Sequence, residues 1–362
     1  MKPSCISCDL FCAVVDNLGD AGVCWRLARQ LATEYGWAMR LWIDDTEPLA
    51  LLRPGIDPLL ERQTVDGVEI RRWPAAFPVV TPAQVVIEAF ACELPPAYVA
   101  AMAGQHLAPV WLNLEYLSAE DWVAGCHGLA SPHPTLPLTK HFFFPGFVAS
   151  TGGLIRERSL AVPPAPTFSG PPTVSLFCYD NPALPRLLDA WAAGAEPLDC
   201  VVAEGLPRRQ VEGWLGAPFA AGSQTTHGHL TLRALPFVPQ PGYDAVLGRC
   251  DLNFVRGEDS FVRAQWAARP FVWQIYPQAE DAHHDKLEAF LKLYAQGIDG
   301  ATATAVSNFW QAWNGRGDAG AAWPDFRAAL PALAAHAPAW AAHLRALGDL
   351  AGNLARFCET RI

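Results

Sequence analysis

Charged side chains are scarce in this sequence, and basic ones are scarcer than acidic ones. Only 17% of the 362 residues are charged, with 26 Lys and Arg against 36 Asp and Glu, for a formal net charge of −10. Binding bare nucleic acid needs a basic face that neutralises phosphates, so we expect no nucleic-acid partner. Hydrophobic residues make up 51% of the chain, which argues against disorder and, at this length, favours two domains.

Long apolar runs and targeting signals are also missing. No uninterrupted apolar run reaches the length of a membrane span, and no basic segment followed by an apolar one indicates a signal peptide. The ten cysteines are scattered, and Cys5, Cys8 and Cys12 have no second Cys/His pair to complete a zinc site. We therefore expect a cytoplasmic protein with reduced thiols, no bound metal and no membrane contact.

Near the N-terminus the sequence predicts a strand followed by a helix. The apolar segment 9–15 has the pattern of a buried strand, and 23–32 has the pattern of a helix. Val23, Leu27 and Leu31 recur on one face of that helix and are expected to face the core.

Two carboxylates lie in the turn between them, Asp16-Asn17-Leu18-Gly19-Asp20-Ala21-Gly22. This turn is not GxGxxG, so a dinucleotide site is disfavoured. We expect Asp16 to end the strand and Asp20 to be the N-cap of the helix. Turn and capping chemistry would account for both residues, but open α/β sheets also bind their ligands at such turns, so catalysis stays open as an alternative.

Apolar segments alternate with helical ones along the rest of the chain. This alternation predicts βαβ units and parallel sheets. The predicted strands are 38–43, 68–73, 85–90, 109–114, 173–179, 198–204, 230–238, 250–255 and 270–276. Polar side chains close several of the early strands and should share one sheet edge, namely Asp16, Asp44, Glu88, Asn113 and Glu115.

A proline-rich stretch at 163–172 is the best candidate for a linker. It would separate an N-terminal Rossmann-like domain, 1–160, from a C-terminal one, 161–337, and the helical tail of about 338–362 should pack back on the first domain. Two facing Rossmann-like domains form the α/β architecture of GT-B glycosyltransferases. Dehydrogenases, epimerases and periplasmic binding proteins also use tandem domains of this kind, so the fold alone does not give the function.

The second informative stretch is 254–267. Here a strand is expected to end at Val255, Gly257 to turn the chain, and a helix to begin near Ser260. The N-terminus of such a helix can bind a diphosphate without a metal, and Arg256 can neutralise it with paired donors.

Two acidic residues in the same stretch leave its role open. Glu258 and Asp259 would have to point away from a phosphate, and sugar hydroxyls are a natural target for them. An ordinary capped helix with an acidic first turn is the alternative.

Several side chains outside these stretches are weaker candidates. Gln240 could offer its amide to a base, and Phe177 and Tyr179, which share a strand face, could stack on one, although core packing would also explain them. His283 and His284 look like a pair of metal ligands, but neighbours on a helix do not share a face, so we expect a loop or helix start there.

Long runs in a fixed order connect these features. They are 16–29, 86–92, 111–120, 150–158, 256–265 and 275–278. In these runs the sequence resembles the EarP family of protein-arginine rhamnosyltransferases, which modify elongation factor P. The resemblance extends from residue 10 to about 290 and is weaker in 160–230 and past 300; the sequence has Leu18 where the family has Phe.

The resemblance implies an inverting, metal-independent GT-B enzyme without a cofactor. It would transfer rhamnose from dTDP-β-L-rhamnose to one arginine of elongation factor P, activating that factor for rescue of ribosomes stalled at polyproline. The implied catalytic residues are Asp20, as the base, Asp16 and Glu258. The implied donor-binding residues are Asn17, Gly19, Phe177, Tyr179, Gln240, Arg256, Gly257, Glu258, Asp259, Ser260 and Tyr276.

Two other functions are kept as alternatives. One is a GT-B enzyme or epimerase with a small-molecule acceptor, and the other is a non-catalytic binder of a basic translation factor. The surface that contacts the acceptor is not evident from the sequence, and Asp44 and Asp45 are the candidates for it.

Overall fold

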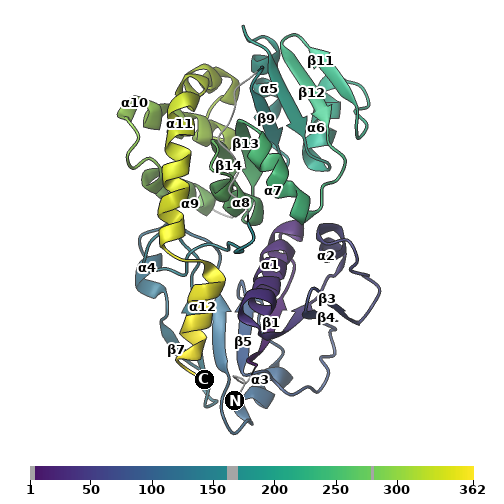
Figure 1. Cartoon of the computed structure of the whole chain (residues 1–362), viewed down its shortest axis with the longest axis vertical. Helices are drawn as coiled ribbons and strands as arrows, with labels where there is room; N and C mark the ends of the chain where they lie inside the picture. The colour runs from purple at the N-terminus through teal and green to yellow at the C-terminus, as the bar shows by residue number, and fades with distance from the viewer. Residues whose placement is uncertain (1–4, 161–169, 279–280) are drawn as a thin grey trace. The chain divides into compact units, whose positions relative to one another are not determined.

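The structure, a computed structural model, describes residues 5–160, 170–278 and 281–362. The chain divides into two compact units: Met1–Leu160 with Leu344–Ile362 form unit 1, and Ala161–His343 form unit 2 (Figure 1). Most of the predicted linker, 163–172, lies outside the described residues. No helix in the described part of the chain is long and apolar enough to cross a membrane.

Unit 1 is built on an eight-stranded sheet in the order β3-β4-β2-β1-β5-β6-β8-β7. Its strands are β1 (Ser7–Cys12), β2 (Ala38–Ile43), β3 (Arg62–Val65), β4 (Val68–Arg72), β5 (Val85–Ala89), β6 (Val110–Leu114), β7 (Ala130–Pro132) and β8 (Thr139–Phe143). The central strands are parallel, and antiparallel β3 and β7 form the two edges. The parallel strands follow the Rossmann order, which reverses between β1 and β5, the place where such sheets bind ligands.

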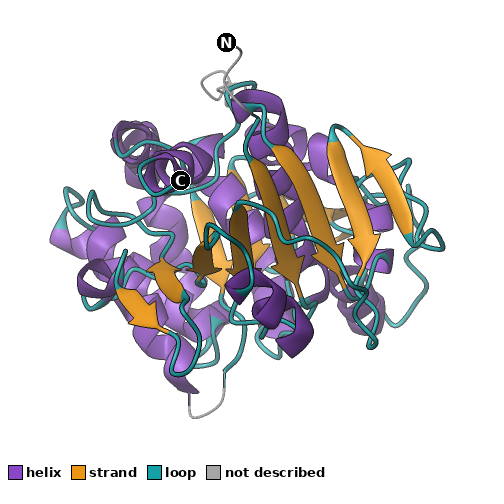
Figure 2. Cartoon of the chain, turned by 90° about the horizontal axis from the view of Figure 1, so that it is seen from below, coloured by secondary structure: helices purple, strands orange, loops and turns teal. Residues whose placement is uncertain are grey.

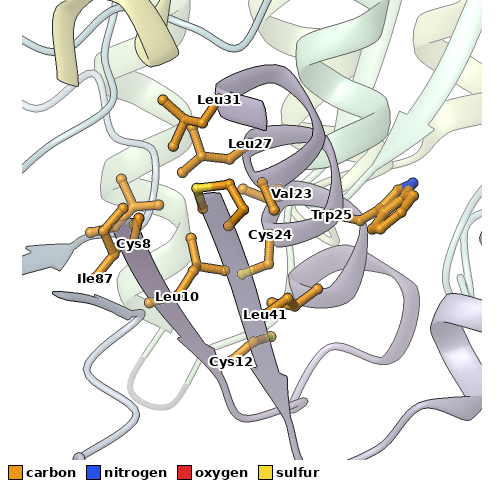
Figure 3. Close-up of a cluster of buried hydrophobic side chains, with 14 of the residues drawn as sticks. Cys8, Leu10, Cys12, Val23, Cys24, Trp25, Leu27, Leu31, Leu41 and Ile87 are labelled. Atoms are coloured by element: carbon orange, nitrogen blue, oxygen red, sulfur yellow. The ribbon is translucent and has the colours of Figure 1, made fainter. Parts of the chain in front are cut away.

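Helices cover both faces of this sheet. They are α1 (Asn17–Tyr35), α2 (Glu47–Leu52), α3 (Pro96–Ala103), α4 (Val123–Cys126) and α12 (Leu350–Glu359). As predicted, Val23, Leu27 and Leu31 face the sheet, where they meet Leu10 and Leu41 (Figure 3). Leu350 and Leu354 of α12 join the same core, whereas Phe11 points to the other face and packs with Tyr98 of α3. Helix α1 ends at Gly36, whose left-handed backbone (φ 70°) suits glycine.

Unit 2 has a six-stranded sheet in the order β11-β12-β10-β9-β13-β14. Its strands are β9 (Thr173–Leu176), β10 (Leu198–Val202), β11 (Gln224–His227), β12 (Leu230–Ala234), β13 (Leu252–Arg256) and β14 (Phe271–Gln274). All neighbours are parallel except β11 and β12, and the order reverses between β9 and β13. Helices flank the strands in Figure 2, and the parallel strand order with a single reversal makes both units Rossmann-like.

The helices of unit 2 include the long C-terminal one. They are α5 (Leu184–Ala192), α6 (Leu206–Leu215), α7 (Gln240–Arg249), α8 (Asp259–Ala267), α9 (Ala282–Tyr294), α10 (Gly300–Trp313) and α11 (Ala319–Ala346). The predicted helical tail consists of parts of two helices, because α11 ends at Ala346 and α12 begins after Asp349. The Asp349 side chain caps α12 by accepting the backbone N–H of Gly352.

Candidate active site

In unit 1, the candidate residues lie in the turn from β1 to α1. The strand ends at Cys12, earlier than predicted, and Asp16 occupies the N-cap position of α1 without making a side-chain capping bond. Asp20 lies inside the first turn of the helix and is only 2% exposed. Its Oδ2 accepts the backbone N–H groups of Val15 and Asp16, each at 2.8 Å.

The prediction that Asp20 is the N-cap is therefore wrong. The Asp20 carboxylate, in the first turn of the helix, instead binds the two backbone N–H groups that precede the helix. These bonds hold the end of the turn against the start of α1. Both of these bonds go to Oδ2, and among the described residues no hydrogen bond reaches Oδ1. Oδ2 of Asp20 is thus anchored in a fixed position by the turn.

Gly19 gives Asp16 its room in this turn. A Cβ built on Gly19 would lie 2.4 Å from Oδ2 of Asp16, so any larger residue would displace that carboxylate. The Gly19 N–H also donates to the Asp16 carbonyl oxygen at 2.6 Å. Asn17 is the first residue of α1, but its side chain is not among the parts of the chain that the structure describes.

The other polar residues predicted at this edge have structural partners. Asp44 accepts the backbone N–H of Val14 at 2.9 Å, and Asp45 accepts that of Glu47 at 3.0 Å, so both shape loops beside the turn. Glu88 lies within β5 and is bound by Lys140 at 3.3 Å, which takes it out of the candidate site.

In unit 2, the candidate residues gather where the strand order reverses. Phe177 and Tyr179 follow β9, and Arg256 ends the neighbouring β13. The Arg256 guanidinium carbon lies 4.5 Å from the Phe177 ring centroid and 4.4 Å from that of Tyr179. The three predicted residues therefore form one cluster in which a cation lies on two aromatic faces.

The turn from β13 to α8 holds this arginine. Gly257 has a left-handed backbone (φ 57°), which suits glycine. The Ser260 hydroxyl accepts the Arg256 N–H at 3.0 Å and donates to the Arg256 carbonyl oxygen at 2.6 Å. Glu258 occupies the N-cap of α8 without a side-chain capping bond, so the end of a nine-residue helix adjoins the arginine cluster.

Two further predicted residues lie near the unit-2 cluster: Gln240, the first residue of α7, and Tyr276, which follows β14. Gln240 is 4% exposed and its amide donates to Asp259 at 3.0 Å, so it supports the first turn of α8. Tyr276 is 42% exposed, and its ring packs edge-on against Tyr179 with centroids 5.5 Å apart. Gln274 accepts the backbone N–H of Tyr179 at 2.8 Å, which links β14 to this cluster.

The sequence interpretation missed Tyr243 of α7. Its ring packs against Phe177 with centroids 5.6 Å apart, and among the described residues its buried hydroxyl has no hydrogen-bond partner. Burial raises the pKa of Tyr243, and Asp259 raises it further. The alternating apolar pattern of β9 indicated Phe177, but a tyrosine on a short helix far along the chain gave no comparable signal.

One group of possible metal ligands is present among the described residues. Asp281, His283 and His284 have ligand atoms that all lie within 4.8 Å of one another, and the two histidine rings are 4.2 Å apart. The two histidines lie at a helix start, as predicted, and there their rings are close together although the residues are neighbours in the chain. His283 also accepts the backbone N–H of Gln278 at 3.3 Å, which ties α9 to the segment that carries Tyr276.

Two Rossmann-like units in series, each with polar side chains gathered where its strand order reverses, have the architecture of the GT-B class of glycosyltransferases. The family model for the elongation factor P (EF-P) rhamnosyltransferase EarP matches residues 8–165 and 165–359. The chain belongs to this EarP family.

Named relatives agree with this assignment. A protein-arginine rhamnosyltransferase of Pseudomonas putida is 49% identical over 334 residues, covering 87% of this chain and 88% of the relative. The one from Pseudomonas aeruginosa is 47% identical over 336 residues, covering 88% and 89%.

Solved structures extend the comparison to the fold. The structure described as the basis for EarP-mediated arginine glycosylation of translation elongation factor EF-P matches with a TM-score of 0.67 and 34% identity, over 99% of this chain and all of that one. The glycosyltransferase of kitacinnamycin, at 14% identity and a TM-score of 0.53, covers 98% of this chain and shares the fold.

Proposed function

We propose that this protein transfers rhamnose from dTDP-β-L-rhamnose to an arginine side chain of elongation factor P, with inversion at the sugar carbon. Membership of the EarP family supports the reaction class and the acceptor. The observation that carries the donor assignment is the cluster of Arg256 with Phe177 and Tyr179 beside the N-terminus of α8. A translation factor as acceptor places the reaction in the cytoplasm.

Unit 2 is assigned the donor. The N-terminus of α8 carries backbone N–H groups and the positive end of the helix dipole, which suit a diphosphate. Arg256 supplies the cationic charge that balances the leaving dTDP, and the aromatic residues around it suit the nucleotide base. We assign Glu258 to the sugar hydroxyls. The other residues proposed to bind the donor are Gly257, Ser260, Gln240, Asp259 and Tyr276.

Unit 1 is assigned the acceptor arginine. The guanidinium has a pKa above about 12, and a carboxylate with a pKa of about 4 cannot deprotonate it in advance. Asp20 instead accepts a hydrogen bond from the guanidinium through its Oδ1, because its Oδ2 is held by the turn. Asp16 helps to orient the group, with Gly19 leaving room for it, and Asn17 and Gly19 remain proposed donor contacts.

The proposed reaction is a single in-line displacement. A guanidinium nitrogen forms a bond to the anomeric carbon of rhamnose while the bond from that carbon to the dTDP oxygen breaks. The proton on the attacking nitrogen passes to Asp20 as the new bond forms, and dTDP leaves with the bonding electron pair. Positive groups near the leaving diphosphate stabilise the developing charge, and none of the assigned roles calls on a metal.

The intact mass of elongation factor P after incubation with the enzyme and dTDP-rhamnose tests the proposal. A gain of one deoxyhexose, located on arginine by fragmentation, is the expected result. Turnover of the sugar nucleotide without modification of the protein would favour a small-molecule acceptor instead. Binding of the factor with neither turnover nor modification would favour a non-catalytic binder.

A further inference from the structure

The loop after β5 has an unusual backbone. Phe90, Ala91 and Glu93 have φ angles of 57°, 54° and 52°, in the left-handed region that residues other than glycine seldom adopt. Strain of this kind is retained where surrounding contacts enforce it, and it occurs often at ligand sites. The backbone of this loop is therefore held in place by its surroundings, as at many ligand sites.

The strained loop presents an aromatic ring at the edge of the sheet. Phe90 stacks on Tyr116, which follows β6, with ring centroids 4.3 Å apart and planes 13° from parallel. The N–H of Phe90 donates to the carbonyl oxygen of Leu114 at 2.7 Å, which fixes the loop to the end of β6. Tyr116 is 37% exposed, so this aromatic pair is accessible on the surface of unit 1.

One buried amide joins this pair to a carboxylate. Asn113 is 1% exposed, and its Oδ1 accepts the N–H of Ala91 at 3.1 Å while its Nδ2 donates to Glu115. The same side chain thus holds the strained loop and orients Glu115. A stacked aromatic pair and a positioned carboxylate are brought together by one residue.

These groups lie beside the turn that carries Asp20. In unit 1 the strand order reverses between β1, which leads to Asp20, and β5, which leads to Phe90. Cys92 of the strained loop donates to the carbonyl oxygen of Phe11 in β1 at 3.5 Å. Leu18 of the turn and Phe90 of the loop are both partly buried against the same hydrophobic core, so the turn and the loop share one neighbourhood.

We propose that Phe90, Tyr116 and Glu115 form the subsite that receives the guanidinium of the acceptor arginine. A guanidinium is planar and weakly hydrated, so it stacks on aromatic faces while its N–H groups bind a carboxylate at its edge. The chain uses the same chemistry in unit 2, where Arg256 lies on Phe177 and Tyr179. This inference rests on the proposed function, and it explains how an arginine would be chosen over a lysine, whose compact ammonium gains less from an aromatic face.

The subsite binds and orients the acceptor, whereas Asp20 takes the proton. Loss of the aromatic pair should therefore raise the KM for elongation factor P more than it lowers kcat. Donor binding in unit 2 should stay unchanged. A selective effect on the acceptor distinguishes loss of the subsite from a general loss of structure, because unfolding would weaken the binding of both substrates.

The first test measures transfer by Tyr116→Ala, Tyr116→Phe and Glu115→Gln at saturating dTDP-rhamnose. We expect Tyr116→Ala and Glu115→Gln to raise the KM for elongation factor P about tenfold, the scale of one stacked or charge-bonded cation, and Tyr116→Phe to restore it. Trp122→Ala is the matched control, because Trp122 is a 52% exposed aromatic residue of unit 1 outside the loop. An unchanged KM in both Tyr116→Ala and Glu115→Gln would overturn the proposal.

A second test keeps the proposal falsifiable if a variant folds poorly. Wild-type and Tyr116→Phe enzymes are compared for binding of elongation factor P with its acceptor arginine intact or changed to lysine. The wild type and Tyr116→Phe should both bind the arginine form about tenfold more tightly than the lysine form, because both keep the aromatic face. Equal binding of both forms by the wild type would refute the subsite, whereas absence of any transfer by the wild type would refute the proposed function itself.

Discussion

The guanidinium carbon of Arg256 lies 4.4 Å from the ring centroid of Tyr179, and Phe177 provides a second ring at 4.5 Å. The backbone of the same arginine is held on both sides by the hydroxyl of Ser260. Because neither the backbone nor the side chain has much freedom, binding a diphosphate would cost little additional ordering. Arg256 is thus preorganised for the donor-binding role that we propose for it.

Replacement of Arg256 by alanine should weaken donor binding. The loss of a charged hydrogen bond corresponds to roughly 1.5–3 kcal/mol, and Arg256→Lys should recover only part of it because a lysine cannot form paired bonds. Calorimetry with dTDP measures the change. Arg233→Ala is the control, since Arg233 lies in the same unit with its side chain 51% exposed and bonds Asp199. If Arg256→Ala bound dTDP with unchanged affinity, the diphosphate would have to bind elsewhere in the protein.

Most strands of the two sheets could be predicted from sequence, whereas β3, β7, β8 and β11 could not. Strands such as β5 and β6 are buried along their whole length, and their sequences are apolar apart from Glu88 and Asn113. Strands β3 and β11 at the edges are short and mostly exposed, so their residues carry no apolar pattern. The nine strands expected after the first one occur within a few residues of their predicted positions.

For the site residues, the sequence predicts features that depend on adjacent residues and misses those that depend on distant segments of the chain. Arg256 and Ser260 could be predicted because a strand, a glycine and a helix start adjoin in the sequence. The backward bonds of Asp20 and the left-handed backbone of Phe90 could not, because both depend on neighbouring chain segments. Nothing in the residue type of Phe90 indicates a positive φ, which usually goes with glycine or asparagine.

Gly19→Ala should lower activity while the protein stays folded. The added Cβ would lie 2.4 Å from Oδ2 of Asp16, and that carboxylate, at the end of a movable side chain, would shift. We expect transfer to fall by up to about 10²-fold, because a displaced orienting group spoils the geometry of attack. Single-turnover kinetics and thermal melting measure the two effects.

Gly213→Ala provides the control for this change. Gly213 lies within α6 with no atom within 4 Å of an added Cβ, so alanine there should stabilise the protein by up to about 1 kcal/mol and leave activity unchanged. If Gly19→Ala turned out equally silent, Asp16 would have no role that depends on its position.

The stability of unit 1 should fall as the pH drops below neutral, in part through His127. Burial lowers the pKa of His127, whose Nδ1 accepts the N–H of Phe144 at 3.0 Å. Because the folded pKa lies below the unfolded value of about 6.5, the unfolded state binds more protons below that pH, and stability is lost until the folded pKa is passed. Urea unfolding across this range measures the loss.

His127→Asn separates this histidine from the other titrating groups. Asparagine can still accept the N–H of Phe144 but does not titrate, so its unfolding free energy should depend less on pH than that of the wild type. Identical pH dependence in the two proteins would mean that His127 titrates normally.

Removal of metal ions should leave the transfer reaction intact. Arg256 and the N-terminus of α8 are assigned the charge on the diphosphate, and the group formed by Asp281, His283 and His284 has no assigned role in the chemistry. Activity after treatment with a chelator is the measurement, with zinc or magnesium added back as the control. A loss that a metal restores would contradict the assignment and direct attention to these histidines.

The last prediction concerns Asp20→Asn. Asparagine has nearly the same size, and its side-chain oxygen can still accept the N–H groups of Val15 and Asp16 that Oδ2 accepts in the wild type. It cannot take a proton from the attacking guanidinium. Turnover should therefore fall at least ~10²-fold, the low end for a positioned acid–base group, while donor affinity and melting temperature change little.

Single-turnover transfer to elongation factor P at saturating donor measures this effect directly. Asp57→Asn is the matched control, because Asp57 also accepts a backbone N–H in unit 1, that of Leu59 at 2.9 Å, but belongs to the loop after α2 and not to the turn. Asp16→Asn should also be slower, with the larger change in the KM for the acceptor, since we assign Asp16 the orientation of the guanidinium. If Asp20→Asn transferred rhamnose at nearly the wild-type rate, Asp20 would be a structural residue of the turn and the proton would need another acceptor.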